Sequence, residues 1–556
     1  MRDFFEKVPK KRIIEVLIFL ALGVVFFLFI HKYPTSLEDS MPYGLTPIVE
    51  KVFDGADVSD RITWEWQSMH QHFAGRSPIY AFFIELGLRA FGLTLIGIRI
   101  FPAIIAFISL IFAYYVLKKF FPGFFAMIFI VLFATSPWYL VLSRSGGIIG
   151  FGMSMTIFSI GMLALTFKNN DQDNWKYYVL SFAAGVVVGI LPYGHASLRL
   201  VPLALLIWTL IHTKYLGWKK TGLFTLGMVS VWCIQLVNIK NAIKMYFNAR
   251  GEGLFDIARS MHADDQMGFI IEKFTDNVRI TLNYLLGLNR MEEFWSVNIA
   301  DTNWSGKVVL YPKFLVPFFL IGFIWCVCSL FKHKKTLYFV PIALLGISVM
   351  PGLMAGLGCP NQARNFLMCM PLYFFIAYAF YKLYSLAKER LKMVEGGVAL
   401  KAANIVLMLI ITSICIFQIH NFYFYEKCEY DEKHTSTHDL LDRVNHFFEE
   451  NPESTVAVFE QPQGEYSYVS LRLFGYPYIE DKLKSGQLWL VTGDNHEAIN
   501  EMIENGEIDI FISLKYPEDL SKFIPSLANI TPVVVQYKKH ELLEYHIISI
   551  NSRNGV

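Results

Sequence analysis

Long apolar stretches recur between residues 13 and 421, and this feature constrains the chain more than any other. A bilayer span needs about 20 mostly apolar residues. In hydrocarbon the backbone must satisfy its own hydrogen bonds, which favours helices. The sequence predicts an α-helical polytopic membrane protein with about 11 transmembrane helices, at 13–31, 96–117, 123–141, 147–167, 177–192, 197–213, 221–239, 312–331, 336–356, 365–385 and 402–421.

The composition agrees with a membrane protein, because only 17% of the residues are charged and 54% are hydrophobic. A typical soluble domain has about 25% charged residues. A disordered chain, a collagen and a small disulfide scaffold are excluded, and the net charge of +2 gives no support for nucleic-acid binding. No small-residue cleavage site follows the first apolar stretch, so we interpret it as a retained helix rather than a signal peptide.

Basic residues predict the orientation, because cytoplasmic loops collect Lys and Arg. With the N-terminus in the cytoplasm, every cytoplasmic connection is basic, at 118–119, 168–176, 214–220, 332–335 and 382–401. Two long loops, 32–95 and 240–311, and the tail from 422 then face the outside. We therefore expect a multi-pass protein of the cell membrane with an extracytoplasmic C-terminal domain.

Two further apolar segments are predicted to be amphipathic helices in the outer interface. Segment 78–92 is too short to span and contains Glu85 and Arg89. If it crossed the membrane, Lys118 and Lys119 would move to the outside. The same interpretation holds for part of 266–288, where apolar residues recur at helical spacing beside charged ones.

The tail changes character from about residue 430. Helical patterns at 439–448 and 495–504 alternate with strand patterns at 455–459, 508–513, 533–537 and 543–550. Such alternation predicts a small α/β domain. The expected organisation is a transmembrane domain at 1–425 and an extracytoplasmic α/β domain at 430–556.

Three short outer loops each contain a single basic residue, and in each case it is an arginine: Arg144, Arg199 or Arg364. One interpretation is that each side chain extends to the lipid headgroups. The other is that the three converge on an anionic ligand, because the planar guanidinium donates two parallel hydrogen bonds to phosphate.

A carboxylate pair, Glu38-Asp39, follows the first predicted span. The pair is either a solvated loop charge or a general base that accepts a proton from a hydroxyl. The same loop contains aromatic and basic residues that could contact a sugar, although Trp also belongs to the ordinary interface belt: Trp64, Trp66, His72 and Arg76. Arginines on this side could stabilise a phosphate leaving group.

Motifs for metal or nucleotide binding are missing from the sequence: it has no CxxC, HExxH, Walker or GxSxG pattern. This absence argues against an ATP-driven pump and a serine hydrolase. We expect neither a metal nor a cofactor.

The order of these parts resembles the GT-C superfamily of polyprenyl-phosphate-sugar-dependent glycosyltransferases, in the branch similar to protein O-mannosyltransferases and bacterial aminoarabinose transferases. The similarity is distributed over residues 33–385, in pieces at 37–39, 75–80, 98–102, 136–144, 193–202 and 351–364. These pieces include an Arg-x-x-Pro opening at Arg99 and a Tyr-x-x-x-x-x-Arg-x-x-Pro pattern that ends at Pro202.

The resemblance implies a lipid-phosphate sugar donor that enters from the bilayer, without a metal or a nucleotide sugar. In the family the first acid of the pair is the general base. Here the order is reversed, so Glu38 occupies that position and the shorter Asp39 is the alternative. Within the matching outer turns, His195 and Asn361 are further candidates for sugar or acceptor contacts.

The expected function is inverting transfer of a sugar from a polyprenyl phosphate to a hydroxyl of an extracytoplasmic protein, lipid or glycan. One alternative is a lipid or polysaccharide transporter or flippase. Ionisable residues are scarce in the spans, Glu15 being the clearest, and no internal repeat is visible, which both argue against a carrier. The other alternative is a catalytically inactive membrane scaffold.

Overall fold

The computed structural model describes residues 10–32, 45, 47–57, 78–168, 174–193, 196–233, 266–286, 312–333, 338–355, 365–391, 397–432, 436–459, 472, 475, 477–491, 495–513, 524–527, 533–536 and 544–549. The chain divides into two compact units. The first comprises residues 1–37, 59–84 and 99–429, and the second comprises 38–58, 85–98 and 430–556.

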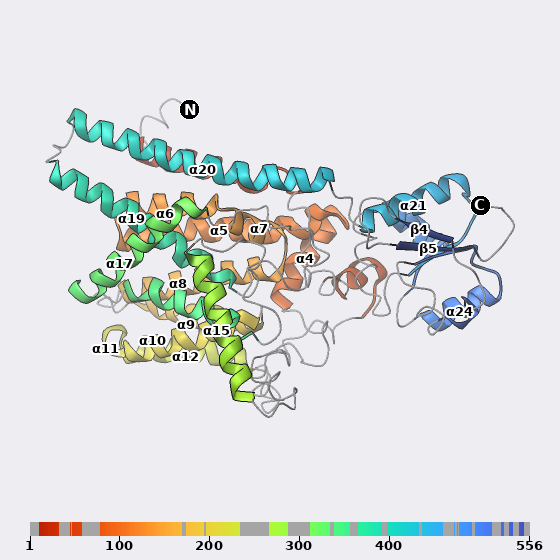
Figure 1. The fold of residues 1–556 in the computed structure, drawn as a ribbon. Helices are drawn as coiled ribbons and strands as arrows, with labels where there is room; N and C mark the ends of the chain where they lie inside the picture. The colour runs from red at the N-terminus through yellow and green to blue at the C-terminus, as the bar shows by residue number, and fades with distance from the viewer. Residues whose placement is uncertain are drawn as a thin grey trace, which may run out of the picture. The chain divides into compact units, whose positions relative to one another are not determined.

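Each of the eleven apolar stretches overlaps at least one helix in the described part of the chain, and Figure 1 labels most of these helices. Six helices are long and apolar enough to cross a membrane, and a bent pair brings this to seven, among the described residues. The helices that lie on the eleven apolar stretches are α2 (Lys10–Phe27), α5 (Leu95–Phe120), α6 (Gly123–Ala134), α7 (Pro137–Arg144), α8 (Ile148–Lys168), α9 (Trp175–Ile190), α10 (Leu200–Ile211), α12 (Trp218–Trp232), α17 (Val316–His333), α18 (Phe339–Leu353), α19 (Cys369–Arg390) and α20 (Val398–Glu432).

The bent pair corrects the expectation of one continuous span over 123–141. Helix α6 ends at Ala134, and α7 begins at Pro137 with its axis turned by 66°. Proline has no N–H and fits the first turn of a new helix. The Ser136 hydroxyl caps that helix by accepting a hydrogen bond from the backbone N–H of Tyr139 at 3.2 Å.

Close backbone contact joins α9 and α12. A Cβ added to Gly185 would lie 2.0 Å from the carbonyl oxygen of Phe224, and one added to Gly227 would lie 2.2 Å from that of Phe182. Small residues allow such approach between apolar helices. Helix α19 packs against α6 and α17, and nearly all of its side chains from Cys369 to Phe380 are buried.

Both segments predicted as interface helices are helical: α4 (Pro78–Phe91) and α15 (Gln266–Leu285). Their position at a membrane surface remains a prediction. Short helical turns complete the description: η1 (Glu50–Asp54), η2 (Leu191–Tyr193), η3 (Ala196–Leu198), α11 (Thr213–Leu216), η5 (Lys313–Leu315), η7 (Phe366–Met368) and η8 (Pro525–Leu527).

The second unit contains a five-stranded sheet in the order β2-β1-β3-β5-β4. Strand β1 is parallel to β2 and β3, whereas β5 is antiparallel to β3 and β4. The elements are α21 (Ser436–Glu450), β1 (Val456–Phe459), α23 (Tyr478–Lys484), β2 (Leu488–Leu490), α24 (His496–Glu504), β3 (Ile510–Ser513), β4 (Val533–Gln536) and β5 (Glu544–Ser549).

Side chains of this sheet alternate between two hydrophobic cores, as the pleat requires. Val456 and Val458 pack with α21 and α23, whereas Ala457 and Phe511 pack with α24. Helices α21 and α24 therefore cover opposite faces of the sheet (Figure 1). The α/β architecture predicted for the tail is confirmed, although α23 and β2 were not anticipated.

Candidate functional site

Two of the predicted site residues, Arg144 and Arg199, lie among the described residues. Both belong to the first unit and both are buried. The other nine lie outside the described residues: Glu38, Asp39, Trp64, Trp66, His72, Arg76, His195, Asn361 and Arg364. The predicted convergence of arginines and carboxylates on one cavity therefore stays a prediction.

Arg144, the last residue of α7, contacts the C-terminal end of α2. Its guanidinium donates to the carbonyl oxygens of Val25 at 3.0 Å and Leu28 at 2.6 Å, and also to the hydroxyl of Tyr423. The rings of Phe422 and Tyr423 lie 5.1 and 5.2 Å from the guanidinium carbon. The last carbonyls of a helix lack intrahelical donors and carry partial negative charge, so a cation there is stabilising.

Arg99, near the start of α5, extends this helix-end contact. It is fully buried, and its guanidinium donates to the carbonyl oxygen of Ile30 at 3.1 Å. Between these carbonyls lies Phe29, whose φ of 54° is the only positive value of a non-glycine residue in the described part of the chain. A left-handed residue commonly ends a helix. The two arginines thus fix the point where α2 ends, eleven residues before Glu38.

Arg199 lies at the N-terminal end of a helix, whereas Arg144 contacts the C-terminal end of one. It is the N-cap residue of α10, with 7% of its surface exposed. Its neighbour Leu198 packs against Gly152 of α8, where an added Cβ would lie 2.4 Å from a Leu198 methyl. The free N–H groups of a helix N-terminus favour anions, so this end is chemically suited to phosphate.

Two buried asparagines hold the end of α18, where the chain leads towards Asn361 and Arg364. The side-chain amide of Asn277 in α15 donates to the carbonyl oxygens of Leu353 at 3.1 Å and Ala355 at 2.9 Å. Asn365 accepts from the backbone N–H of Gly352 at 3.0 Å. These bonds constrain both sides of the segment that contains a predicted phosphate-binding arginine.

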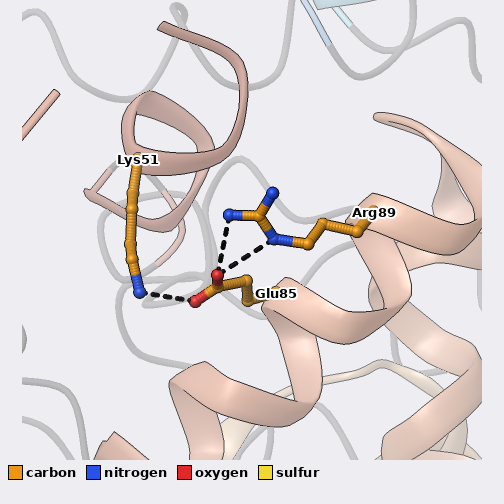
Figure 2. A network of polar contacts seen from close by, with 3 residues as sticks. All are labelled: Lys51, Glu85 and Arg89. Carbon is orange, nitrogen blue, oxygen red and sulfur yellow. Dashed lines mark hydrogen bonds and ion pairs between the residues drawn. The ribbon is translucent and has the colours of Figure 1, made fainter. Parts of the chain in front are cut away.

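An ion-pair network connects η1 with α4 in the second unit, as Figure 2 shows. Lys51 donates to Glu85 at 2.7 Å, and Arg89 donates to the other oxygen of Glu85 at 3.0 and 2.9 Å. Burial by itself raises the pKa of Glu85, but hydrogen bonds from both cations outweigh it and hold that pKa below its ordinary value. Glu85 and Arg89, which made segment 78–92 a poor span, therefore form part of a connection between α4 and η1.

An apolar groove of about 290 Å³ lies between α15, α17 and α18. Its lining includes Thr281, Leu285, Phe323, Leu345 and Gly346. An engineered apolar cavity of about 150 Å³ accepts a benzene ring, so this groove has room for a short length of hydrocarbon chain. No cluster of three or more His, Cys, Asp or Glu side chains suited to a metal occurs among the described residues.

Sequence reasoning did not select Arg99, Asn277, Asn365 or Tyr423 as functional residues. Arg99 could have been selected from the sequence, since an ionisable residue within an apolar helix requires a partner. The other three gave none, because their importance depends on contacts with distant segments. Tyr423, for example, lies 279 residues from Arg144.

Comparison with known proteins bears on these observations. Residues 75–238 match the family described as dolichyl-phosphate-mannose-protein mannosyltransferase. This region includes the Arg99 motif, Arg144 and Arg199. Comparison with curated protein sequences gave no match.

Solved structures with a similar fold cover nearly the whole chain. The apo structure of ArnT from Cupriavidus metallidurans superposes with a TM-score of 0.56 and 9% identity, over 97% of this chain and 98% of that one. Its complex with undecaprenyl phosphate gives 0.51 and 12%, with the same coverage. The oligosaccharyltransferase AglB from Archaeoglobus fulgidus, in complex with an inhibitory peptide and a dolichol-phosphate, gives 0.50 and 11%, over 93% and 71%.

The protein is therefore a polytopic membrane protein with the fold of ArnT and AglB. The resemblance to the GT-C superfamily of glycosyltransferases, first visible in scattered motifs, is confirmed.

Proposed function

We propose that the protein is a membrane glycosyltransferase that moves a sugar from a polyprenyl-phosphate donor to a hydroxyl of an extracytoplasmic protein, lipid or glycan. The transfer inverts the anomeric carbon. Glu38 or Asp39 accepts the proton of the attacking hydroxyl, and Arg199 and Arg364 stabilise the departing phosphate. Arg144 was predicted to share this phosphate role, but its observed bonds to α2 favour a different role, which is to hold that helix end.

One observation carries the proposal: the family match lies on the region that contains two of the three predicted outer-turn arginines, Arg144 and Arg199, within a fold that covers nearly all of ArnT. ArnT binds undecaprenyl phosphate and AglB binds a dolichol-phosphate. Both ligands are polyprenyl phosphates, so the same class of lipid is the natural donor carrier here. Fixed cations near a leaving phosphate stabilise the transition state by several kcal/mol in a site without water.

The polyprenyl chain of the donor is proposed to bind in the apolar groove between α15, α17 and α18. Gly346 lines this groove, and a Cβ added to it would meet no atom within 4 Å. Gly346→Leu should therefore fill space that the lipid needs without a clash. Displacing about two CH₂ groups of the lipid chain from the groove costs roughly 1.6 kcal/mol, or about fifteenfold in affinity.

Gly222→Leu in α12 is the matched control, because a Cβ added there also meets no atom within 4 Å and Gly222 is not among the groove residues. Both substitutions replace a helical glycine with a better helix former. Binding of undecaprenyl phosphate to protein in lipid nanodiscs is the measurement. Equal affinities of the two variants would remove the groove from the proposal.

The carboxylate pair provides the test of catalysis. Protein in nanodiscs receives a polyprenyl-phosphate-linked radiolabelled sugar and a membrane extract as the acceptor source. Glu38→Gln should abolish transfer while polyprenyl-phosphate binding persists, and Asp39→Asn should have the milder effect. A hydroxyl is far less acidic than a carboxylic acid, so the base acts during transfer and its position matters more than its basicity.

The same assay separates the alternatives. Neither a flippase nor a scaffold releases polyprenyl phosphate in this assay. A flippase would instead move the labelled lipid across the bilayer of sealed vesicles, and a scaffold would not. Wild-type transfer by the double variant, Glu38→Gln with Asp39→Asn, would remove both residues from the mechanism. A polyprenyl phosphate that copurifies with the protein would further support the donor class.

A further inference from the structure

The helical bundle of the first unit presents a basic and aromatic surface at one of its ends. Ser181 bonds to the carbonyl oxygen of Lys220, and a Cβ added to Gly185 would lie 2.0 Å from that of Phe224. Both contacts join residues 39 positions apart, so α9 and α12 run parallel. Their N-terminal ends therefore lie at the same end of the bundle, where α11 joins α10 to α12 (Figure 1). Three lysines and three aromatic residues are exposed at this end: Trp175, Lys176, Lys214, Tyr215, Trp218 and Lys219.

The aromatic side chains of this surface are far more open than a folded core would leave them. Trp218 is 79% exposed, Trp175 is 68% exposed and Tyr215 is 64% exposed. Trp and Tyr concentrate where the hydrocarbon of a bilayer meets water. Each of the two tryptophans is followed directly by an exposed lysine, at Lys176 and Lys219. The surface thus combines a ring and a cation at the start of both parallel helices.

Exposed apolar side chains continue from this surface along the same helices. On α9, Val179 lies one turn beyond Trp175 and is 54% exposed. On α12, Leu226 and Val229 follow Trp218 along one face and are 56% and 39% exposed. A soluble polyanion needs no apolar surface beside the lysines, whereas a lipid needs a headgroup site next to an apolar one. The surface therefore fits an amphiphile.

The charge of the surface is positive. Residues 174–233 contain neither Asp nor Glu, and no carboxylate pairs with the three exposed lysines within the described part of the chain. Asp171 and Asp173 precede α9, outside the described residues. The lysines that the sequence places at this end outnumber them: Lys168, Lys176, Lys214, Lys219 and Lys220. An anion is therefore the complementary ligand.

We propose that this basic and aromatic surface binds the headgroups of anionic phospholipids in preference to zwitterionic ones. The lysines contact the headgroup phosphate, and the exposed apolar side chains of α9 and α12 contact the acyl chains. Under the predicted orientation the surface faces the cytoplasmic leaflet, whose anionic lipids attract basic segments next to spans. The proposal is independent of the transfer reaction, because it uses neither the carboxylate pair nor the arginines of the predicted outer turns.

The test titrates the full-length protein in detergent with phosphatidylglycerol or with phosphatidylcholine. Native mass spectrometry gives the Kd of the first bound lipid. Lys219→Gln removes one cation and leaves the ring of Trp218 in place. One lysine near an anionic lipid surface contributes about fivefold in affinity. We expect this variant to bind phosphatidylglycerol about fivefold more weakly and phosphatidylcholine as the wild type does, whereas Lys219→Arg should bind both lipids as the wild type does.

Lys401→Gln is the matched control. Lys401 is also an exposed lysine in the first turn of an apolar helix, α20, and the sequence has no aromatic residue within one turn of it. This variant should keep the wild-type affinity for phosphatidylglycerol. An unchanged affinity in Lys219→Gln would overturn the proposal, and so would an equal loss in Lys401→Gln, because any lysine beside the membrane would then have the same effect.

Two further measurements locate the lipid and identify its source. A photoactivatable phosphatidylglycerol should label peptides 175–182 and 213–220, and should label them less in Lys219→Gln. The preference for phosphatidylglycerol should shrink as salt rises from about 0.1 M to about 1 M, because the Debye length falls from about 10 Å to about 3 Å. Labelling confined to other helices would contradict the proposal. Displacement of the lipid by glycerol phosphate at a similar concentration would also contradict it, because the surface would then recognise a soluble anion.

Discussion

Replacing Arg144 with Gln should cost the protein stability rather than donor binding. The buried guanidinium makes hydrogen bonds to the carbonyl oxygens of Val25 and Leu28, and a charged donor contributes about 1.5–3 kcal/mol per bond. Tyr423 also donates to the Val25 oxygen at 2.7 Å and replaces part of one bond. Taking the lower value for each bond, we expect about 3 kcal/mol of destabilisation.

Arg89→Gln is the matched control, because it makes the same change of charge and side chain at an exposed ion pair. Arg89 is 55% exposed beside Glu85, and such pairs contribute about 0.2–1 kcal/mol. Thermal unfolding of both variants in the same nanodiscs measures the difference. A double-mutant cycle with Tyr423→Phe should give a coupling energy of about 1 kcal/mol, because the two groups share acceptors.

The opposite result would refute this reasoning. If Arg144→Gln unfolds within about 0.5 kcal/mol of Arg89→Gln and loses donor affinity instead, the bonds to α2 contribute little. Arg144 would then return to the phosphate role that its place in a predicted outer turn first suggested.

Three further predictions follow from the fold. Cysteine labelling from the outside should reach residues 32–95, 240–311 and the tail, and labelling near Lys118 from the outside alone would contradict the orientation. Gly185→Ala should destabilise the α9–α12 pair, because its Cβ would lie 2.0 Å from a backbone oxygen; Gly222→Ala, which meets no atom within 4 Å, is the control in the same unfolding assay. Because the pKa of Glu85 is lowered, its ion pairs should stabilise the fold at pH values above the ordinary pKa of a glutamate. This stabilisation should be lost as the pH falls through the lowered pKa. Hydrogen exchange around Glu85 should therefore speed up in acid, and Glu85→Gln should abolish this step.

The helices could be predicted from sequence because a membrane span imposes a length and a composition on consecutive residues. The same argument failed at residues 134–137, where the hydropathy stays high through a Ser-Pro pair. A proline at the first position of a helix and one within a helix look alike in a hydropathy window. Only the 66° bend between α6 and α7 distinguishes them.

The candidate site was less predictable, because its contacts join distant segments. Residue type and loop sidedness selected Arg144, but its partners on α2 and α20 depend on the packed bundle. In the second unit, Arg472 and Asp54 form an ion pair although they lie 418 residues apart, and neither belongs to a motif. A single sequence contains no local pattern that would pair them.

Arg199 provides the clearest test of the phosphate site, because it lies at a helix end of opposite sign to the one that Arg144 contacts. As the N-cap residue of α10, its backbone adjoins N–H groups that favour an anion. Arg144 instead binds the carbonyl end of α2, which repels one. Arg199→Gln should therefore weaken undecaprenyl-phosphate binding about tenfold, the loss of one charge-assisted contact of about 1.4 kcal/mol. Its unfolding temperature should change less than that of Arg144→Gln, and Arg199→Lys should keep most of the affinity because the charge remains. Equal donor affinity in the Arg199→Gln variant and the wild type would separate this arginine from the phosphate, and would leave Arg364 as the remaining candidate among the three arginines of the predicted outer turns.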